Sequence, residues 1–245
     1  MPDEPGRKGA REAELLDILA ESFDVAEVST EVGGVRYDLL RPRSAEDLIS
    51  EADFDRDERL PYWADLWPSA HRLAEEVSRM PGAGRRLLEL GCGLGLVSAA
   101  ALRAGWKVLA TDYYEDALRF AEANAWRNAG TRLCTQLLDW RSLPRDLGRF
   151  DVVVASDVLY ERPYANLVAG ALARTLAPGG EGVIADPGRL AAGEFVSTCE
   201  SLGLQVTREG PHEWREGDLV QRITILRLRW RGSAPGTSRT SGDRA

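Results

Sequence analysis

The stretch LLELGCGLGL at residues 87–96 places three glycines directly after a short run of apolar residues. An apolar run of this length predicts a buried strand, and the glycines predict a tight loop in which the backbone can closely approach a ligand. A helical pattern follows at 96–105 and ends at a glycine. A strand, a glycine-rich loop and a helix in this order indicate one unit of a parallel α/β sheet.

The same alternation continues on both sides of this unit. Seven strands are predicted, at 85–90, 106–112, 133–140, 150–157, 181–187, 204–209 and 219–230. Helices are predicted at 68–79, 96–105, 115–130, 163–180 and 190–203, the fourth ending in a Pro-Gly-Gly stop. Alternating strands and helices predict a parallel sheet with helices on both faces, and the short connection between the last two strands predicts an antiparallel pair at one edge. We therefore expect an α/β fold with a Rossmann-like, seven-stranded, mostly parallel sheet.

The residues before this sheet predict an N-terminal extension over 1–60. A helix is expected at 11–23 and a β-hairpin at 26–40, where apolar residues alternate on either side of Gly33-Gly34. The acidic stretch at 50–61 is interpreted as a solvated connector, with a docking surface for a basic substrate as the alternative. The sheet domain is expected to span 61–230, and the tail at 231–245 is expected to be disordered.

Composition excludes several classes of protein. The net charge of −8 over 245 residues disfavours binding of double-stranded DNA through a positive field and suits a cationic partner, although it also simply favours solubility. No apolar run is long enough to cross a bilayer, and the polar start lacks the core of a signal peptide, so a cytoplasmic protein is expected. The three cysteines and two histidines show no ligand spacing, so no metal site is expected. Each cysteine is expected to be a small buried residue, and His71 a surface or packing residue.

The residues around the glycine loop indicate which cofactor it holds. Asp112 ends the next predicted strand, 21 residues after Gly91, where a carboxylate can accept hydrogen bonds from both hydroxyls of a ribose. A dinucleotide fingerprint would have a third glycine at the position of Leu96. Glu89 would repel a pyrophosphate and can bind an ammonium group, directly or through water. These features favour S-adenosylmethionine, whose product after transfer is S-adenosylhomocysteine, over NAD.

A third strand end supports this interpretation. Asp139 and Trp140 close the next predicted strand, where the carboxylate can accept from the adenine amino group and the indole can stack on the ring. A turn aspartate and a core tryptophan would be the ordinary interpretation of this pair alone. Their position after a strand that neighbours those of Gly91 and Asp112 favours binding.

In this order, the segments ELGCGLGL, ATD, LDW and ASDVLY resemble the seven-β-strand S-adenosylmethionine-dependent methyltransferases. The preceding PYWADLWPSA resembles the entry segment of the seven-strand protein lysine methyltransferases, the family that includes the electron-transfer-flavoprotein β-subunit lysine methyltransferase. The resemblance spans about residues 61–189. It implies that the methionine part of the cofactor lies on Glu89, Gly91 and Gly93, the ribose on Asp112, and the adenine on Asp139 and Trp140. It also implies that Trp67 lines the pocket and that Ser156 contributes through its backbone, while for Trp63 a packing role is equally compatible.

The resemblance places Asp157 and Tyr160, from ASDVLYERP, beside the acceptor nitrogen. Asp157 can attract an incoming ammonium and orient it, and Tyr160 can contact the lysine stem or the amine. The ordinary alternative is that Asp157 caps a turn and Tyr160 packs. Enzymes that methylate bases or glutamine often carry Asn/Asp-Pro-Pro-Tyr here, and this chain lacks both prolines. Asp186-Pro187, after the fifth strand, is interpreted as a structural turn.

The predicted function is therefore that of a protein lysine N-methyltransferase, with a lysine-bearing protein as partner and neither nucleic acid nor membrane. A small-molecule N-methyltransferase and a non-catalytic cofactor-binding scaffold are the alternatives on the same fold. A nicotinamide-dependent oxidoreductase is disfavoured by Leu96 and Glu89. The sequence leaves the oligomeric state, the substrate and the degree of methylation open.

Overall fold

The computed structural model describes residues 5–44, 48 and 61–232. Most of the acidic stretch and nearly all of the C-terminal tail lie outside the described residues. The seven predicted core strands form one sheet: β3 (Arg86–Leu90), β4 (Lys107–Asp112), β5 (Cys134–Leu137), β6 (Phe150–Ser156), β7 (Leu176–Asp186), β8 (Leu204–Glu216) and β9 (Leu219–Trp230). Their order is β5-β4-β3-β6-β7-β9-β8. Only β9 runs antiparallel to its neighbours, so the predicted mostly parallel sheet is confirmed.

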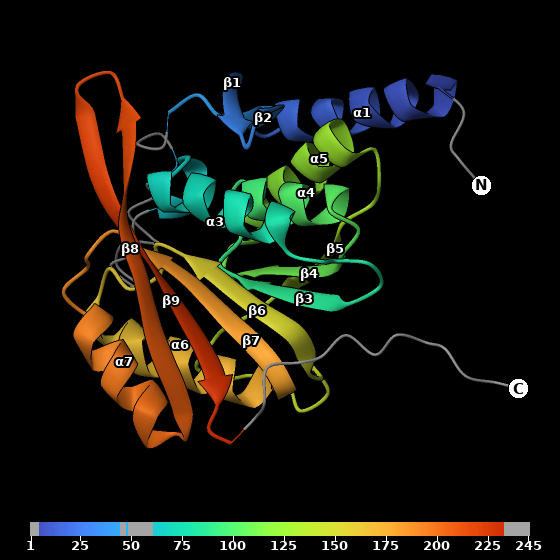
Figure 1. Ribbon diagram of the computed structural model, residues 1–245. Helices are drawn as coiled ribbons and strands as arrows, with labels where there is room; N and C mark the ends of the chain where they lie inside the picture. The colour runs from blue at the N-terminus through green and yellow to red at the C-terminus, as the bar shows by residue number, and fades with distance from the viewer. Residues whose placement is uncertain (1–4, 45–47, 49–60, 233–245) are drawn as a thin grey trace, which may run out of the picture.

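Helices cover both faces of this sheet, as predicted (Figure 1). On one face lie α3 (Pro68–Arg79), α4 (Leu96–Arg103) and α5 (Glu115–Ala129), and on the other lie α6 (Arg162–Thr175) and α7 (Ala192–Ser201). Successive strand residues point to opposite faces, so Leu87 packs into the core under α3 and α4, while Leu88 packs into the core under α6 and α7. Both residues are fully buried, which explains why apolar residues stand next to each other in β3 and do not alternate with polar ones.

The N-terminal extension comprises α1 (Pro5–Ala20) and a hairpin of β1 (Val25–Val32) and β2 (Val35–Pro42). It lies over α5, on the outer side of the helical layer (Figure 1). Asn124 of α5 docks the hairpin: its Oδ1 accepts from Leu40 N at 2.6 Å, and its Nδ2 donates to Leu40 O at 2.9 Å. The same Nδ2 lies 2.9 Å from Leu94 O, so one buried amide links the hairpin to the glycine loop.

Removing this amide is expected to destabilise the whole domain. Asn124→Ala leaves up to three buried backbone groups without a partner, which we expect to lower the free energy of unfolding by about 3 kcal/mol. Denaturant titration followed by circular dichroism measures the loss. The matched control is Asn128→Ala, one turn further on, where the side chain also bonds β2 but is only half-buried and should cost less. Equal, small losses in the two variants would contradict the proposed docking role.

Three strands begin or end three or more residues from their predicted bounds. β5 ends at Leu137, so Asp139 and Trp140 follow the strand and do not close it. Leu176 leaves α6 for extended backbone and pairs with Phe150, so β7 begins there and the Pro-Gly-Gly segment lies inside the strand, beside a register shift. Local propensity marked a stop at 178–180, but pairing with β6 ended the helix first. β8 continues to Glu216 across a register shift after Glu209, because it remains paired with β9 over this length. The resulting hairpin projects beyond the sheet (Figure 1).

Candidate active site

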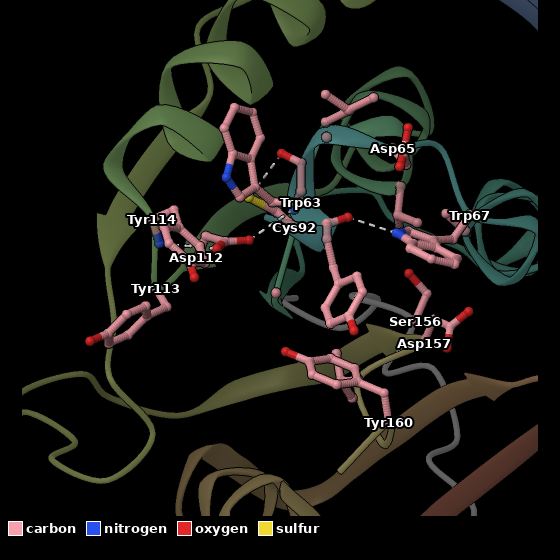
Figure 2. A pocket seen from close by; sticks show the side chains of 18 of the residues that line it. Trp63, Asp65, Trp67, Cys92, Asp112, Tyr113, Tyr114, Ser156, Asp157 and Tyr160 are labelled. Carbon is pink, nitrogen blue, oxygen red and sulfur yellow. Dashed lines mark hydrogen bonds between the residues drawn. The ribbon is translucent and has the colours of Figure 1, made fainter. Parts of the chain in front are cut away.

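A cavity opens where the carboxyl ends of β3, β4, β5 and β6 meet (Figure 2). The structure brings all but one of the predicted site residues to its wall: Trp67, Gly91, Gly93, Asp112, Asp139, Trp140, Ser156, Asp157 and Tyr160. Parallel strands deliver their carboxyl ends to one edge, which is why residues far apart in the sequence converge here. Glu89 is the exception, since it is not among the lining residues.

Asp112 organises the glycine loop from the end of β4. Its Oδ2 accepts from Gly93 N at 3.0 Å and its Oδ1 from Tyr114 N at 3.1 Å, as the dashed lines of Figure 2 show. The side chain is buried, and this burial raises the pKa of Asp112 although the backbone N–H groups of Gly93, Tyr114 and Tyr113 oppose the shift. A carboxylate has about four acceptor positions, so the group can accept a further hydrogen bond from a ligand in the cavity.

The loop itself leaves no room for side chains. Gly91 and Gly93 have φ of 72° and 49°, in the left-handed region that favours glycine. A Cβ on Gly91 would lie 3.1 Å from Val158 and 3.5 Å from Trp140, and one on Gly93 would lie 3.2 Å from Trp63 O. The loop backbone therefore packs closely against Val158, Trp140 and the backbone of Trp63, and it forms one wall of the cavity, here called the cradle.

Glu89 lies beneath this cradle. It is 1% exposed, and one carboxyl oxygen accepts from Ser98 Oγ at 2.5 Å. Burial raises the pKa of Glu89 to about 8, with the nearby Asp112 contributing in the same direction. The predicted contact between Glu89 and a ligand ammonium stays a prediction, and any such contact would have to form from behind the loop.

The pKa of Glu89 predicts a pH dependence of stability. The folded protein holds a proton on Glu89 up to about pH 8, whereas the unfolded chain releases it near the ordinary glutamate pKa of 4.5. Stability is therefore greatest below the unfolded value and falls as pH rises between these limits, by up to about 1.4 kcal/mol per pH unit from this group. Glu89→Gln should flatten the decline, measured as unfolding free energy from pH 5 to pH 8. Parallel wild-type and variant profiles would show that Glu89 is not responsible.

Asp139 and Trp140 follow β5 and line the cavity. Asp139 accepts from Arg141, through its backbone N at 2.9 Å and through its guanidinium at 2.9 Å, so this carboxylate is partly engaged in a turn. Trp140 packs edge-on against Tyr164, with ring centroids 5.8 Å apart, and its indole nitrogen is buried with no hydrogen-bond partner among the residues that the structure describes. The turn role that was weighed for Asp139 is thus real, and the side chain still lines the cavity.

Asp157 follows β6 in an unusual conformation. Its φ of 55° makes it the only residue other than glycine with positive φ in the described chain, a strain that costs about 1 kcal/mol or more. Its N donates to Ala185 O at 3.0 Å, and its Oδ1 accepts from Arg189 Nε at 2.7 Å. Its Oδ2 is buried and has no partner among the described residues. The fold therefore holds a strained, buried carboxylate at the cavity wall.

Aromatic rings surround this end of the cavity. The ring centroid of Tyr62 lies 5.0 Å from that of Tyr160 and 6.0 Å from that of Trp67, and Trp67 Nε1 donates to Tyr62 O at 2.7 Å (Figure 2). The ring centroid of Tyr164 lies 4.9 Å from that of Tyr160. The sequence interpretation missed Tyr62, which stands within the quoted PYWADLWPSA, and Tyr164, which directly follows the quoted ASDVLYERP. Trp63 lines the cavity and also packs on Phe120, so the packing role is present and a contribution to ligand binding stays a prediction.

Other singled-out residues lie elsewhere. His71 is half-buried, contacts Thr30 Oγ1 at 3.0 Å, and has its pKa lowered by burial, in line with a packing role. Asp186 accepts from the backbone N of Gly188 at 2.8 Å and forms the predicted turn. Cys134 is exposed, which corrects the expectation that every cysteine is buried: β5 is short, lies at the sheet edge and is open to solvent there.

The described residues contain neither a cluster of metal ligands nor a helix that could span a membrane. Within residues 5–44, 48 and 61–232, no group of three or more histidine, cysteine, aspartate or glutamate side chains is placed to hold a metal ion. Among the helices the structure describes, none combines the length and the apolar character needed to cross a bilayer.

The sequence resembles known methyltransferases along its central part. Residues 87–180 match the family described as "Methyltransferase domain". The chain is 33% identical to protein-lysine methyltransferase METTL21E of Mus musculus, over 42% of this chain and 47% of the relative. It is 33% identical to the electron transfer flavoprotein beta subunit lysine methyltransferase of Xenopus laevis, over 53% of each chain. It is 35% identical to a ubiquinone biosynthesis O-methyltransferase of Ralstonia nicotianae, over 44% and 46%. The chain thus spans about half the length of these curated relatives.

The fold has close counterparts among solved structures. The N-methyltransferase NodS of Bradyrhizobium japonicum, solved in complex with S-adenosyl-L-homocysteine, superposes with a TM-score of 0.55 at 18% identity. The match covers 76% of this chain and 98% of NodS, so the shared part is the sheet with its helices. The chain therefore has the seven-stranded, Rossmann-like fold, and residues 87–180 within it are similar to the methyltransferase domain family.

Proposed function

We propose that the protein is an S-adenosylmethionine-dependent N-methyltransferase that methylates a lysine side chain of a protein substrate. The observation that carries this proposal is Asp157, a strained and buried carboxylate placed among Tyr62, Trp67 and Tyr160 at one end of the cavity. A negative charge with aromatic walls suits a cationic alkyl amine. The two lysine methyltransferases among the relatives support the same acceptor, and the net charge of −8 favours a basic protein over a nucleic acid.

The cavity fits the proposed cofactor. The bare backbone at Gly91 and Gly93 would hold the methionine part, and Asp112 would accept from the ribose hydroxyls. The indole of Trp140 would stack on the adenine, with Asp139 beside it. When bound, S-adenosylmethionine supplies a methyl group on a sulfonium that is already activated. What remains for the protein is to orient the acceptor and to exclude water.

The end of the cavity around Asp157 must bind and orient the acceptor amine. A protonated amine has no lone pair, so the lysine must lose its proton before it attacks the methyl group. Asp157 attracts the incoming ammonium and orients it through a charge-assisted hydrogen bond, and Tyr160 contacts the stem or the amine. We propose that a water molecule then carries the proton away.

The second candidate is methylation of a small molecule, favoured by the likeness to a ubiquinone biosynthesis O-methyltransferase. Transfer to a hydroxyl requires a base to remove its proton, and histidine is the commonest such base. No histidine stands among the described residues that line the cavity. The lining therefore supports an amine acceptor better than a hydroxyl acceptor.

Labelling of a cell lysate tests the proposal. Purified protein and S-adenosylmethionine carrying a tritiated methyl group are added to a methylation-deficient lysate, and labelled species are separated by size. We expect a labelled protein band whose modified residue is identified as lysine by mass spectrometry. Label confined to small molecules would instead support the second candidate, and an absence of label would refute both.

A further inference from the structure

The guanidinium of Arg189 pairs with Asp157, the carboxylate to which the proposed function assigns the substrate amine. Arg189 follows β7 in the chain, and its Nε donates to Asp157 Oδ1 at 2.7 Å. The Asp157 side chain is only 2% exposed, whereas the Arg189 side chain is 35% exposed. The guanidinium thus lies between the buried carboxylate and solvent.

The geometry of the Arg189–Asp157 ion pair differs from that of a typical structural pair of an arginine and a carboxylate. An arginine that fixes a carboxylate for structural reasons commonly binds both oxygens through two parallel hydrogen bonds. Here Nε is the only guanidinium nitrogen of Arg189 with a hydrogen bond among the described residues, and Asp157 Oδ2 is left without a partner among them. A second cation could therefore satisfy Asp157 better than Arg189 does.

The surroundings of Arg189 are those of a bound alkyl cation. Its guanidinium carbon lies 5.7 Å from the ring centroid of Trp67, within the range of a cation–π contact. Trp67 and Asp157 both line the cavity, and Arg189 does not. A long basic side chain with its charge on Asp157 and its flank on an aromatic ring is also the arrangement expected of a lysine acceptor.

The backbone at Arg189 is fixed in a turn, whereas its guanidinium has a single hydrogen bond among the described residues. Asp186 Oδ1 accepts from the backbone N of Gly188 and of Arg189, and Arg189 O accepts from Ala192 N at 3.1 Å. Asp186 is itself buried, and its Oδ2 has no partner among the described residues, so a second carboxylate lies next to this turn. Leu190, the next residue, is 93% exposed. Arg189 can therefore leave Asp157 without disrupting a packed core.

We propose that the Arg189 guanidinium takes the position of the substrate cation while no substrate is bound, and that an acceptor ammonium reaches Asp157 by displacing it. This inference rests on the proposed function for the identity of the acceptor. It makes Arg189 a specificity-determining residue: only a cation that outcompetes a tethered guanidinium gains access to the carboxylate. The tethered cation also keeps Asp157 paired while no substrate is bound.

Binding of a simple alkyl cation tests this inference without methyl transfer. We titrate n-butylammonium chloride into wild type and Arg189→Ala in a calorimeter, with n-butanol as the neutral probe. Arg189→Ala is expected to bind n-butylammonium at least tenfold more tightly than wild type, with no change for n-butanol. The matched control is Arg229→Ala, which removes an arginine paired with Glu181 outside the cavity and should show no gain. If Arg189→Ala fails to fold, Arg189→Gln keeps most of the side-chain length and should show the same gain.

Two results would overturn the inference. One is equal affinity for n-butylammonium in wild type and the Arg189 variants. The other is a gain that persists when Asp157→Asn is added to Arg189→Ala, since the cation would then bind elsewhere. The outcome is separable from the proposed function: a gain without protein labelling refutes lysine transfer alone, and labelling without a gain refutes the role of Arg189 alone.

Discussion

Asp157→Asn is expected to lower methyl transfer by about 100-fold or more while leaving the affinity for S-adenosylmethionine within about threefold of wild type. Asparagine has the same shape and is one of the few residues that tolerate the φ of 55° at this position, so the backbone should be retained. What is lost is the charge that attracts and orients the acceptor ammonium. The partner left behind, Arg189, is partly exposed and can be solvated, so the variant should remain folded.

The measurement pairs a tritiated-methyl assay with calorimetric titration of the cofactor. Asp116→Asn on α5 is the control, because it removes a carboxylate outside the cavity and should alter neither quantity. Methyl transfer by Asp157→Asn at close to the wild-type rate would show that the carboxylate has no part in acceptor binding. A loss of cofactor affinity equal to the loss of transfer would indicate that Asp157 acts in binding the cofactor and not the acceptor.

Asp112→Asn is expected to have the opposite profile, with cofactor affinity lowered by about 10- to 100-fold and transfer at saturating cofactor largely kept. Both oxygens of Asp112 accept backbone N–H groups, from Gly93 and Tyr114. An asparagine amide must turn its own NH₂ toward one of these donors, so it loses the loop contact on one side or a ribose hydroxyl on the other. The site is buried, so water does not replace the missing acceptor.

Calorimetry on Asp112→Asn gives the dissociation constant, and the tritium assay at several cofactor concentrations separates KM from kcat. A raised KM with nearly unchanged kcat is the expected result. An unchanged dissociation constant would contradict the assigned role. The two aspartates together form a crossed test, since each variant serves as the control for the other.

Much of this site follows from local pattern in the sequence. The apolar run before Gly91 could only be a buried strand, and the carboxyl end of such a strand fixes where a ligand lies. Asp112 and Asp157 were found because each stands immediately at the end of an apolar run. Parallel pairing then brings them to one cavity without further information.

The other features of the site and the fold depend on contacts between distant residues, which sequence spacing does not encode. Arg189 lies 32 residues from Asp157 and reaches it only because β6 and β7 are neighbours. Glu89 looked like a ligand contact from its position, but alternation along β3 directs its side chain toward Ser98 behind the loop. The start of β7 at Leu176 was missed because a long-range pairing with Phe150 overrode the local helical pattern.

The central claim is that the cavity around Asp112 and the glycine loop binds S-adenosylmethionine. It is tested most directly by calorimetric titration of the purified protein with S-adenosylmethionine and, separately, with NAD. The account predicts saturable binding of S-adenosylmethionine at one site per chain, weakened by Asp112→Asn, and no binding of NAD. Tight binding of NAD with no heat from S-adenosylmethionine would contradict it.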